Sequence, residues 1–116
     1  MELDVWLTTD DSIIVNHDAT LNDVTIQTSS YEQVKNLQLS NGEYVPRLQD
    51  FLKLVQDGGK VKLLIEFKAH STLARSYECV QKVMDAVNSA GILDRCEFHS
   101  QNNNICAQIT KIEPRA

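Results

Sequence analysis

Apolar and polar side chains alternate along residues 2–8, and this period of two predicts a β-strand. Turn-forming residues follow at 8–11, and a second apolar run at 12–17 predicts that the chain returns as the other strand of a β-hairpin. If the tip of the hairpin is Asp10 and Asp11, residues whose numbers sum to 21 face each other across it.

The second half of the chain alternates between strand patterns and helix patterns. Residues 61–68 form a nearly continuous apolar run, which predicts a strand buried on both faces, as in a parallel sheet. Apolar residues at helical spacing predict a long helix at about 72–89, with Gly91 as its C-terminal cap. A strand at 96–100 and a helix at 102–112 complete the series. This order predicts an α/β fold with a parallel sheet.

The middle of the chain carries shorter patterns. A strand is expected within 23–28, and a serine-capped short helix within 29–39. A second amphipathic helix is expected to begin near Pro46 and to end at the Asp-Gly-Gly sequence of 57–59. The length of 116 residues predicts one domain, residues 1–116.

Composition and charge exclude several classes of function. The net charge is −5 and there is no cluster of lysine or arginine, which argues against nucleic acid as a partner. The apolar runs are too short to cross a bilayer, and there is no signal peptide pattern, so we expect no transmembrane segment. A cytoplasmic, periplasmic or secreted location is compatible with the sequence. Three cysteines without CxxC spacing are expected to be reduced and mostly buried.

Charged residues occur inside the predicted strands. Glu2 and Asp4 are two residues apart and therefore share a face, as do Glu66 and Lys68 at the end of the 61–68 strand. Charges at the carboxyl end of a buried parallel strand are costly unless something satisfies them, and α/β folds place their sites at that end. The hairpin register expected above would also bring His17 opposite Asp4.

This set of side chains would suit a cation and an anionic ligand. Glu2, Asp4 and Glu66 would offer three carboxylates to Mg²⁺ or Ca²⁺, and Lys68 would suit a phosphate. His17 could exchange protons near neutral pH. The alternative is that Glu2 and Asp4 form a solvated edge and that Glu66 simply pairs with Lys68. The spacing alone leaves both interpretations open.

Several blocks of the sequence resemble the glycerophosphodiester phosphodiesterases in order and in spacing. They are ELDVWLTTDDSIIVNHDATL, VPRLQDFL and LLIEFK, followed by EFHSQNNNICAQITKIEP, which resembles the family's next strand and helix. The resemblance covers nearly the whole chain, and its first block is the most specific. It implies an α/β fold of the TIM-type (β/α) barrel kind, in which the second strand continues into a β-hairpin.

The resemblance also implies roles for individual residues. Glu2, Asp4 and Glu66 would be ligands of a divalent cation, Mg²⁺ or Ca²⁺, and Lys68 would face the substrate phosphate. His17 would be one of two catalytic histidines and would act as the general acid on the leaving oxygen. The implied reaction is metal-assisted hydrolysis of a small-molecule glycerophosphodiester to glycerol 3-phosphate and an alcohol.

Two parts of the family pattern have no counterpart in the 116 residues. One is the His-Arg-Gly motif on the first barrel strand, which carries the other catalytic histidine, and the other is the C-terminal half of the barrel. We therefore expect a partial barrel that is completed by a second copy, as a homo-oligomer, or by a complementary half. We also expect little or no turnover from this chain alone, because half of the acid/base pair is missing.

Other functions and other residues complete the set of hypotheses. A non-catalytic metal-binding or assembly module of the same fold is the main alternative, and a phosphodiesterase of phospholipids would share the ligand set. Asp18, His70 and Ser100 are further candidates for the pocket. His99, on the strand at 96–100, is expected to be structural.

Overall fold

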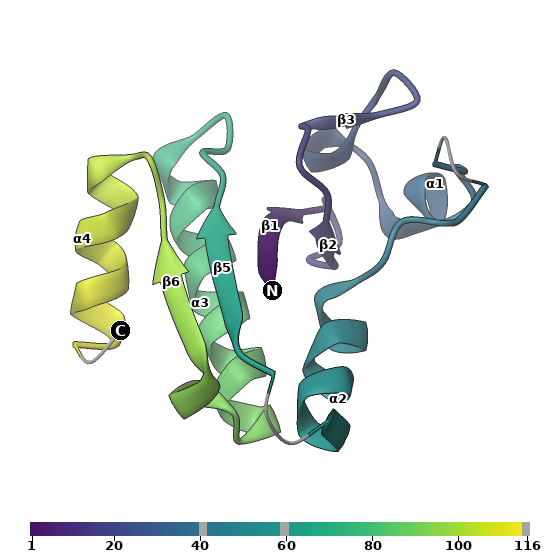
Figure 1. The fold of residues 1–116 in the computed structure, drawn as a ribbon. Helices are drawn as coiled ribbons and strands as arrows, with labels where there is room; N and C mark the ends of the chain where they lie inside the picture. Colours follow the sequence, from purple (N-terminus) through teal and green to yellow (C-terminus); the bar gives the residue numbers. More distant parts are fainter. Residues whose placement is uncertain (40–41, 59–60, 115–116) are drawn as a thin grey trace.

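A four-stranded mixed sheet organises the chain, as Figure 1 shows. The computed structural model describes residues 1–39, 42–58 and 61–114. The strand order is β2-β1-β5-β6, in which β1 is parallel to β5, β5 is parallel to β6, and β2 runs antiparallel to β1. The four strands are β1 (Glu2–Leu7), β2 (Ile13–Val15), β5 (Leu63–Phe67) and β6 (Cys96–His99). The predicted α/β fold with a parallel sheet is confirmed, and so is the β-hairpin.

Three helices cover one face of this sheet. Alternate strand residues, among them Val5, Ile65 and Phe67, are buried in one core with apolar residues of the helices. These helices are α2 (Leu48–Gly58), α3 (Leu73–Ala90) and α4 (Asn103–Ile112). Strands β1, β5 and β6 and helices α3 and α4 thus form two layers, a common way for an amphipathic sheet to bury its apolar face. None of the helices in the described ranges is both long and apolar enough to cross a membrane.

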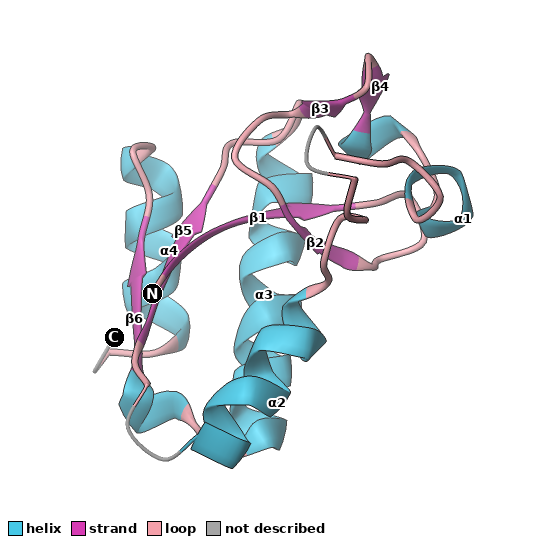
Figure 2. Cartoon of the chain, turned by 45° about the vertical axis from the view of Figure 1, so that its right-hand side comes forward, coloured by secondary structure: helices cyan, strands magenta, loops and turns pink. Residues whose placement is uncertain are grey.

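Residues between β2 and α2 form a smaller unit beside the sheet. Its apolar side chains pack around Trp6 and Ile14 in a second cluster. Figure 2 shows the small hairpin and the short helix of this unit at the end of the molecule away from α2. Its elements are β3 (Thr20–Leu21), β4 (Val24–Thr25), η1 (Ile26–Thr28) and α1 (Tyr31–Val34). A second 3₁₀ turn, η2 (Leu93–Arg95), precedes β6.

The helix predictions are confirmed, because local signals fix the ends of these helices. At the start of α3 the Thr72 side chain accepts a hydrogen bond from the Arg75 N–H, and at its end Gly91 adopts a left-handed conformation with φ of 71°. Helix α2 begins at Leu48, two residues later than expected. Its described part ends at Gly58, while residue 59 of the predicted stop lies outside the described residues.

The prediction that the 61–68 strand is buried on both faces is wrong. In β5, Leu63, Ile65 and Phe67 are buried, but Leu64 is 39% exposed and Glu66 is partly exposed. The reason is that the helices cover only one side of the sheet. We call the other side the polar face; it is made by Glu2, Asp4, Leu64, Glu66, Glu97 and His99, which alternate with the core residues of their strands.

The predicted hairpin register is also wrong, by one residue. Val5 faces Val15 and Leu7 faces Ile13, so the numbers of facing residues sum to 20 instead of 21. The connection is a five-residue loop, 8–12, closed by the Thr8 N–H donating to the Ser12 carbonyl at 3.0 Å. The Asp11 N–H donates to the Thr8 carbonyl at 3.1 Å, so the tight turn is centred on Thr9 and Asp10 instead of Asp10 and Asp11. Because side chains alternate faces, this shift removes His17 from its expected position opposite Asp4.

Candidate active site

One row of residues across three parallel strands carries the charged groups of the polar face. Asp4 of β1 pairs with Glu66 of β5, and Glu66 pairs with His99 of β6. Directly paired residues in neighbouring strands share a face and lie about 4.8 Å apart along the row. Glu2 lies on the same face, one step earlier on β1. The sequence therefore places two carboxylates and an imidazole side by side on adjacent strands.

The ammonium group of Lys68 lies against this row. Its Nζ is 2.8 Å from Glu66 Oε2 and 3.7 Å from Asp4 Oδ1. The hydrogen bond from Lys68 lowers the pKa of Glu66, and the same hydrogen bond raises the pKa of Lys68. Lys68 is thus a charged donor directed at two carboxylates, and its side chain is only 22% exposed.

Glu2 adds a third carboxylate beside Asp4. Partial burial raises the pKa of Glu2, and the negative charge of Asp4, with which it shares a hydrogen bond, raises it further. Glu66 acts in the same direction on the pKa of Glu2, while Lys68 opposes the effect. Three carboxylates next to a single lysine are therefore short of positive charge, which is a feature of sites that bind a cation.

The donor chemistry of these residues fits a hard divalent cation. Carboxylate oxygens are the ligands that Mg²⁺ and Ca²⁺ prefer, and Glu2, Asp4 and Glu66 could supply them. The side chains are not arranged as a formed metal site: within the described ranges no three His, Cys, Asp or Glu residues have that arrangement. The position of Lys68 between Asp4 and Glu66 gives a physical reason, since its ammonium group already neutralises part of their charge.

The structure does not bring His17 together with the carboxylates. Its side chain is 79% exposed, and its Nδ1 lies 3.1 Å from Oδ1 of Asp18, which is equally exposed. The loop itself stays close to β1, because the Asn16 N–H donates to the Asp4 carbonyl at 3.0 Å. His17 and Asp18 are thus neighbours of the site at the backbone level, while their side chains point into solvent.

The other two candidates have different surroundings. His70 is buried; the Leu7 N–H donates to its Nε2 at 3.0 Å, and its Nδ1 is 3.0 Å from the Lys68 carbonyl. Burial lowers the pKa of His70, so its ring serves as a neutral link between two backbone segments. Ser100 is also buried, and its hydroxyl donates to the Phe67 carbonyl at 2.7 Å.

A hollow of about 270 Å³ lies at the carboxyl ends of β5 and β6. Glu66, Lys68, Ser100 and Asn102 are among the residues that line it. It adjoins the charged row, because it is lined by Glu66, a member of that row, and by Lys68, which lies 2.8 Å from Glu66. A substrate phosphate at this position would lie at the strand ends where α/β folds place their sites.

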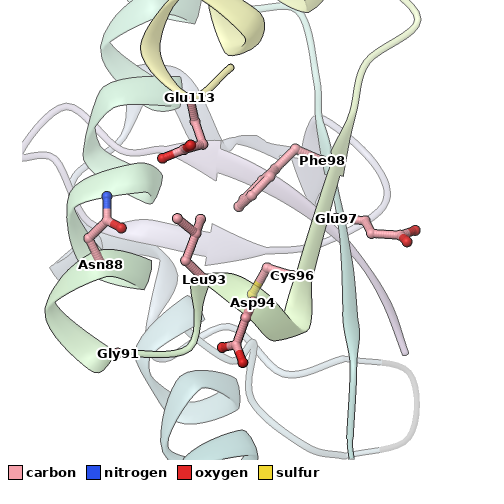
Figure 3. A pocket seen from close by; sticks show the side chains of 8 residues that line it. All are labelled: Asn88, Gly91, Leu93, Asp94, Cys96, Glu97, Phe98 and Glu113. Atoms are coloured by element: carbon pink, nitrogen blue, oxygen red, sulfur yellow. The ribbon is translucent and has the colours of Figure 1, made fainter. Parts of the chain in front are cut away.

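A larger hollow, of about 520 Å³, lies at the opposite end of β6 and has different chemistry. Figure 3 shows Leu93, Phe98 and Glu113 directed into it, whereas Glu97 points away. Burial raises the pKa of the Cys96 thiol on its wall to about 11, so this thiol is not an activated nucleophile. Cys96 therefore gives this hollow no activated nucleophile, and the smaller hollow, which adjoins Glu66 and Lys68, is the better candidate.

His99 is the residue of this region whose position beside the carboxylates the sequence does not predict. The sequence pattern predicts a structural role for His99, yet its side chain is exposed on the polar face, directly beside Glu66. One sequence signal could have identified it. His99 is the last residue of a strand that is followed by a helix, and α/β folds place their sites at the carboxyl ends of such strands. What the sequence could not provide was the register between β5 and β6.

Comparisons with known proteins agree with this architecture. The model of the glycerophosphoryl diester phosphodiesterase family matches residues 1–115. The uncharacterised protein YqiK of Bacillus subtilis is 29% identical over 126 residues, which cover 98% of this chain and 51% of YqiK.

Solved structures give the same result. A glycerophosphodiester phosphodiesterase from Parabacteroides distasonis is 31% identical with a TM-score of 0.94, over 99% of this chain and 48% of that one. A glycerophosphodiester phosphodiesterase from Agrobacterium tumefaciens is 22% identical with a TM-score of 0.81, over 98% and 50% of the two chains. The chain thus spans about half the length of these relatives. It belongs to the glycerophosphoryl diester phosphodiesterase family, a family of phosphodiester hydrolases, and its open sheet and helices form part of a TIM-type barrel.

Proposed function

We propose that this chain carries the cation-binding and phosphate-binding part of a site that hydrolyses glycerophosphodiesters to glycerol 3-phosphate and an alcohol. The observation that carries the proposal is the convergence of Glu2, Asp4, Glu66 and Lys68 on the polar face of the parallel strands. Family membership supports the same chemistry.

Each residue has a role in this proposal. Glu2, Asp4 and Glu66 would hold Mg²⁺ or Ca²⁺, which when bound would neutralise phosphoryl oxygens and orient the diester. Lys68 would leave its carboxylate partners and donate to a phosphate oxygen in the neighbouring hollow. His17 would protonate the leaving oxygen, which requires its exposed side chain to turn toward the polar face.

A specific observation favours a second candidate, a non-catalytic module that binds a cation or assembles with another chain. The hairpin register places the His17 side chain in solvent with Asp18 as its partner, instead of beside Asp4. General acid catalysis needs the proton donor within hydrogen-bond reach of the leaving oxygen. If His17 cannot reach it, cation binding would persist without turnover.

Cation titration and an activity assay separate these possibilities. Calorimetric titration with Mg²⁺ and Ca²⁺ should show binding that Glu66→Gln and Asp4→Asn abolish. Glu97→Gln, on the same face but one step from the row, should retain it. Hydrolysis of glycerophosphocholine with either cation present then tests catalysis; we expect little or no turnover from this chain alone. Absence of cation binding in the unmodified chain would refute the proposal.

We further propose that the chain assembles into a dimer or a larger oligomer. In the part of the chain that the structure describes, the four-stranded sheet ends at β2 on one side and at β6 on the other. A bridge between Ile14 and Arg47, with the Val15 N–H donating to the Pro46 carbonyl at 3.0 Å, partly covers the β2 edge, whereas no described strand pairs with the outer edge of β6. Such an edge favours pairing with another chain. Sedimentation velocity over a range of protein concentrations tests this; a single monomeric species throughout would refute it.

A further inference from the structure

His99 is the one member of the charged row whose side chain is not already engaged. Asp4 and Glu66 are within reach of Lys68, whereas no hydrogen bond or ion pair holds the His99 ring among the described residues. His99 is nevertheless paired directly with Glu66 across β5 and β6, so the two side chains share the polar face. An exposed, unengaged imidazole beside a proposed cation ligand is available to a bound molecule.

The spacing of the strands decides what this imidazole could touch. A cation held between Asp4 and Glu66 would lie between β1 and β5, and β6 is one strand further on, about 4.8 Å beyond β5. This separation, about 9.6 Å between the backbones of Asp4 and His99, puts His99 on the far side of Glu66 from Asp4. It matches the position of a substrate that is bound to the cation and extends along the row.

The electrostatics of the row favour an anionic substrate on this side. Lys68 approaches Glu66 at 2.8 Å and supplies one donor to the hollow at the ends of β5 and β6. His99 is not among the residues that line this hollow; it is the last residue of β6, paired with the lining residue Glu66 and followed in the chain by the lining residue Ser100. A phosphodiester between them would receive donors from two neighbouring strands, which fixes its orientation as well as its charge.

We propose that His99 is a substrate-binding residue whose imidazole N–H donates a hydrogen bond to an oxygen of the phosphodiester. The inference rests on the proposed function, because it takes the cation and Lys68 as the groups that hold the rest of the phosphate. It adds a residue from β6 to a site otherwise built from β1, β5 and the hairpin.

The test measures two affinities in the full chain. Mg²⁺ is titrated first, and glycerol 3-phosphate is then titrated with Mg²⁺ at saturation. His99→Ala should weaken glycerol 3-phosphate binding by about 10- to 100-fold, the loss expected for one hydrogen bond to a charged group. His99→Gln should recover part of this loss, because its amide also donates. Mg²⁺ affinity should stay within about twofold in both variants, and Glu97→Gln should not weaken phosphate binding.

Each other outcome overturns the inference in a distinguishable way. Unchanged glycerol 3-phosphate affinity in His99→Ala, with Mg²⁺ binding intact, refutes the role of His99 and leaves the proposed function standing. Loss of Mg²⁺ affinity in His99→Ala, to the extent seen in Glu66→Gln, would show that His99 supports the cation instead of the substrate. If Mg²⁺ does not bind the unmodified chain at all, the proposed function fails, and the inference fails with it. A shift of the His99 ring proton signal on adding glycerol 3-phosphate gives an independent reading of the contact.

Discussion

His70 is the best test of how the strands are held in position around the site. Its ring accepts a hydrogen bond from the Leu7 N–H at the end of β1 and lies 3.0 Å from the Lys68 carbonyl just after β5. Its own backbone N–H donates to the Ser76 hydroxyl at 2.8 Å in α3. The buried ring of His70 therefore links the ends of the two strands that carry the carboxylates, while its backbone N–H ties the same segment to α3. Replacement of the His70 side chain should therefore lower the free energy of unfolding.

The magnitude follows from the group that would be left without a partner. Leu7 is fully buried, so in His70→Phe its N–H would lose its acceptor without gaining water. A buried donor left unpaired costs about 1–3 kcal/mol. The Lys68 carbonyl is only partly buried and should add less. For a chain of this size, about 4 °C of melting temperature is lost per kcal/mol. His70→Gln should lose less than His70→Phe, because its amide oxygen can accept from the same N–H.

The same residue predicts a pH dependence of stability. Burial lowers the pKa of His70 below its ordinary value of 6.5, and Arg75 acts in the same direction. Below about pH 6.5 the unfolded chain therefore binds a proton that the folded chain does not, and stability falls as the pH decreases. One such proton gives a slope of at most about 1.4 kcal/mol per pH unit.

Urea unfolding between pH 7.5 and 5.5 measures this slope. The unmodified chain should lose stability over this range, and His70→Gln should show a smaller loss, since Gln does not titrate. Equal slopes in the two proteins would refute the linkage. Equal destabilisation by Gln and Phe at pH 7.5 would show that the hydrogen bond from Leu7 is not what His70 contributes.

Three further changes test other parts of the structure. Gly91→Ala puts a side chain on a residue in the left-handed conformation that ends α3, and this should lower the free energy of unfolding in urea by about 1 kcal/mol. No clash adds to this cost, because no atom lies within 4 Å of the new Cβ; an unchanged urea midpoint would contradict the prediction. Lys68→Met removes the ammonium group from Glu66 and should strengthen Mg²⁺ binding by about fivefold, which corresponds to about 1 kcal/mol for a partly exposed ion pair. Weaker Mg²⁺ binding would refute the idea that Lys68 and Mg²⁺ compete for Glu66. The thiol of Cys79 is fully buried, and burial raises its pKa to about 12, so it should react with a thiol reagent at pH 8 only after unfolding; rapid labelling in the folded chain would refute this.

The sequence was a good guide wherever the determining contacts are local. The amphipathic stripe and the Thr72 and Gly91 caps fix helix α3 within a residue or two of its expected range. Alternation within one strand correctly placed Glu2 and Asp4 on a common face. The free state of all three cysteines also agrees with the expectation, although only Cys79 is fully buried.

It was a poor guide wherever the outcome depends on register between strands. The residues around Asp11 are compatible with a two-residue turn, but the Thr8 hydroxyl accepts from the Ser12 N–H at 2.9 Å and stabilises a longer loop in which Asp11 adopts φ of 66°. That single residue of difference redirected His17. The row of Asp4, Glu66 and His99 depends on pairings between distant segments, for which one strand's pattern carries no information.

The separation of β1 from its partner along the chain has a consequence for the order of folding. Strand β5, helix α3 and strand β6 are consecutive, whereas residues 8–62 intervene between β1 and β5. Closing a loop of about 55 residues costs roughly 3–4 kcal/mol of chain entropy before any β1–β5 contact forms. We therefore expect Glu66, Lys68 and His99 to be positioned early in folding, and Glu2 and Asp4 to join them late. Substitutions at the β1–β5 contact, such as Val5→Ala, should then mainly accelerate unfolding; a comparable slowing of refolding would contradict this order. Glu2, Asp4 and Glu66 would then come together in the last step of folding. Cation binding in a refolding experiment would therefore report the completion of the native state.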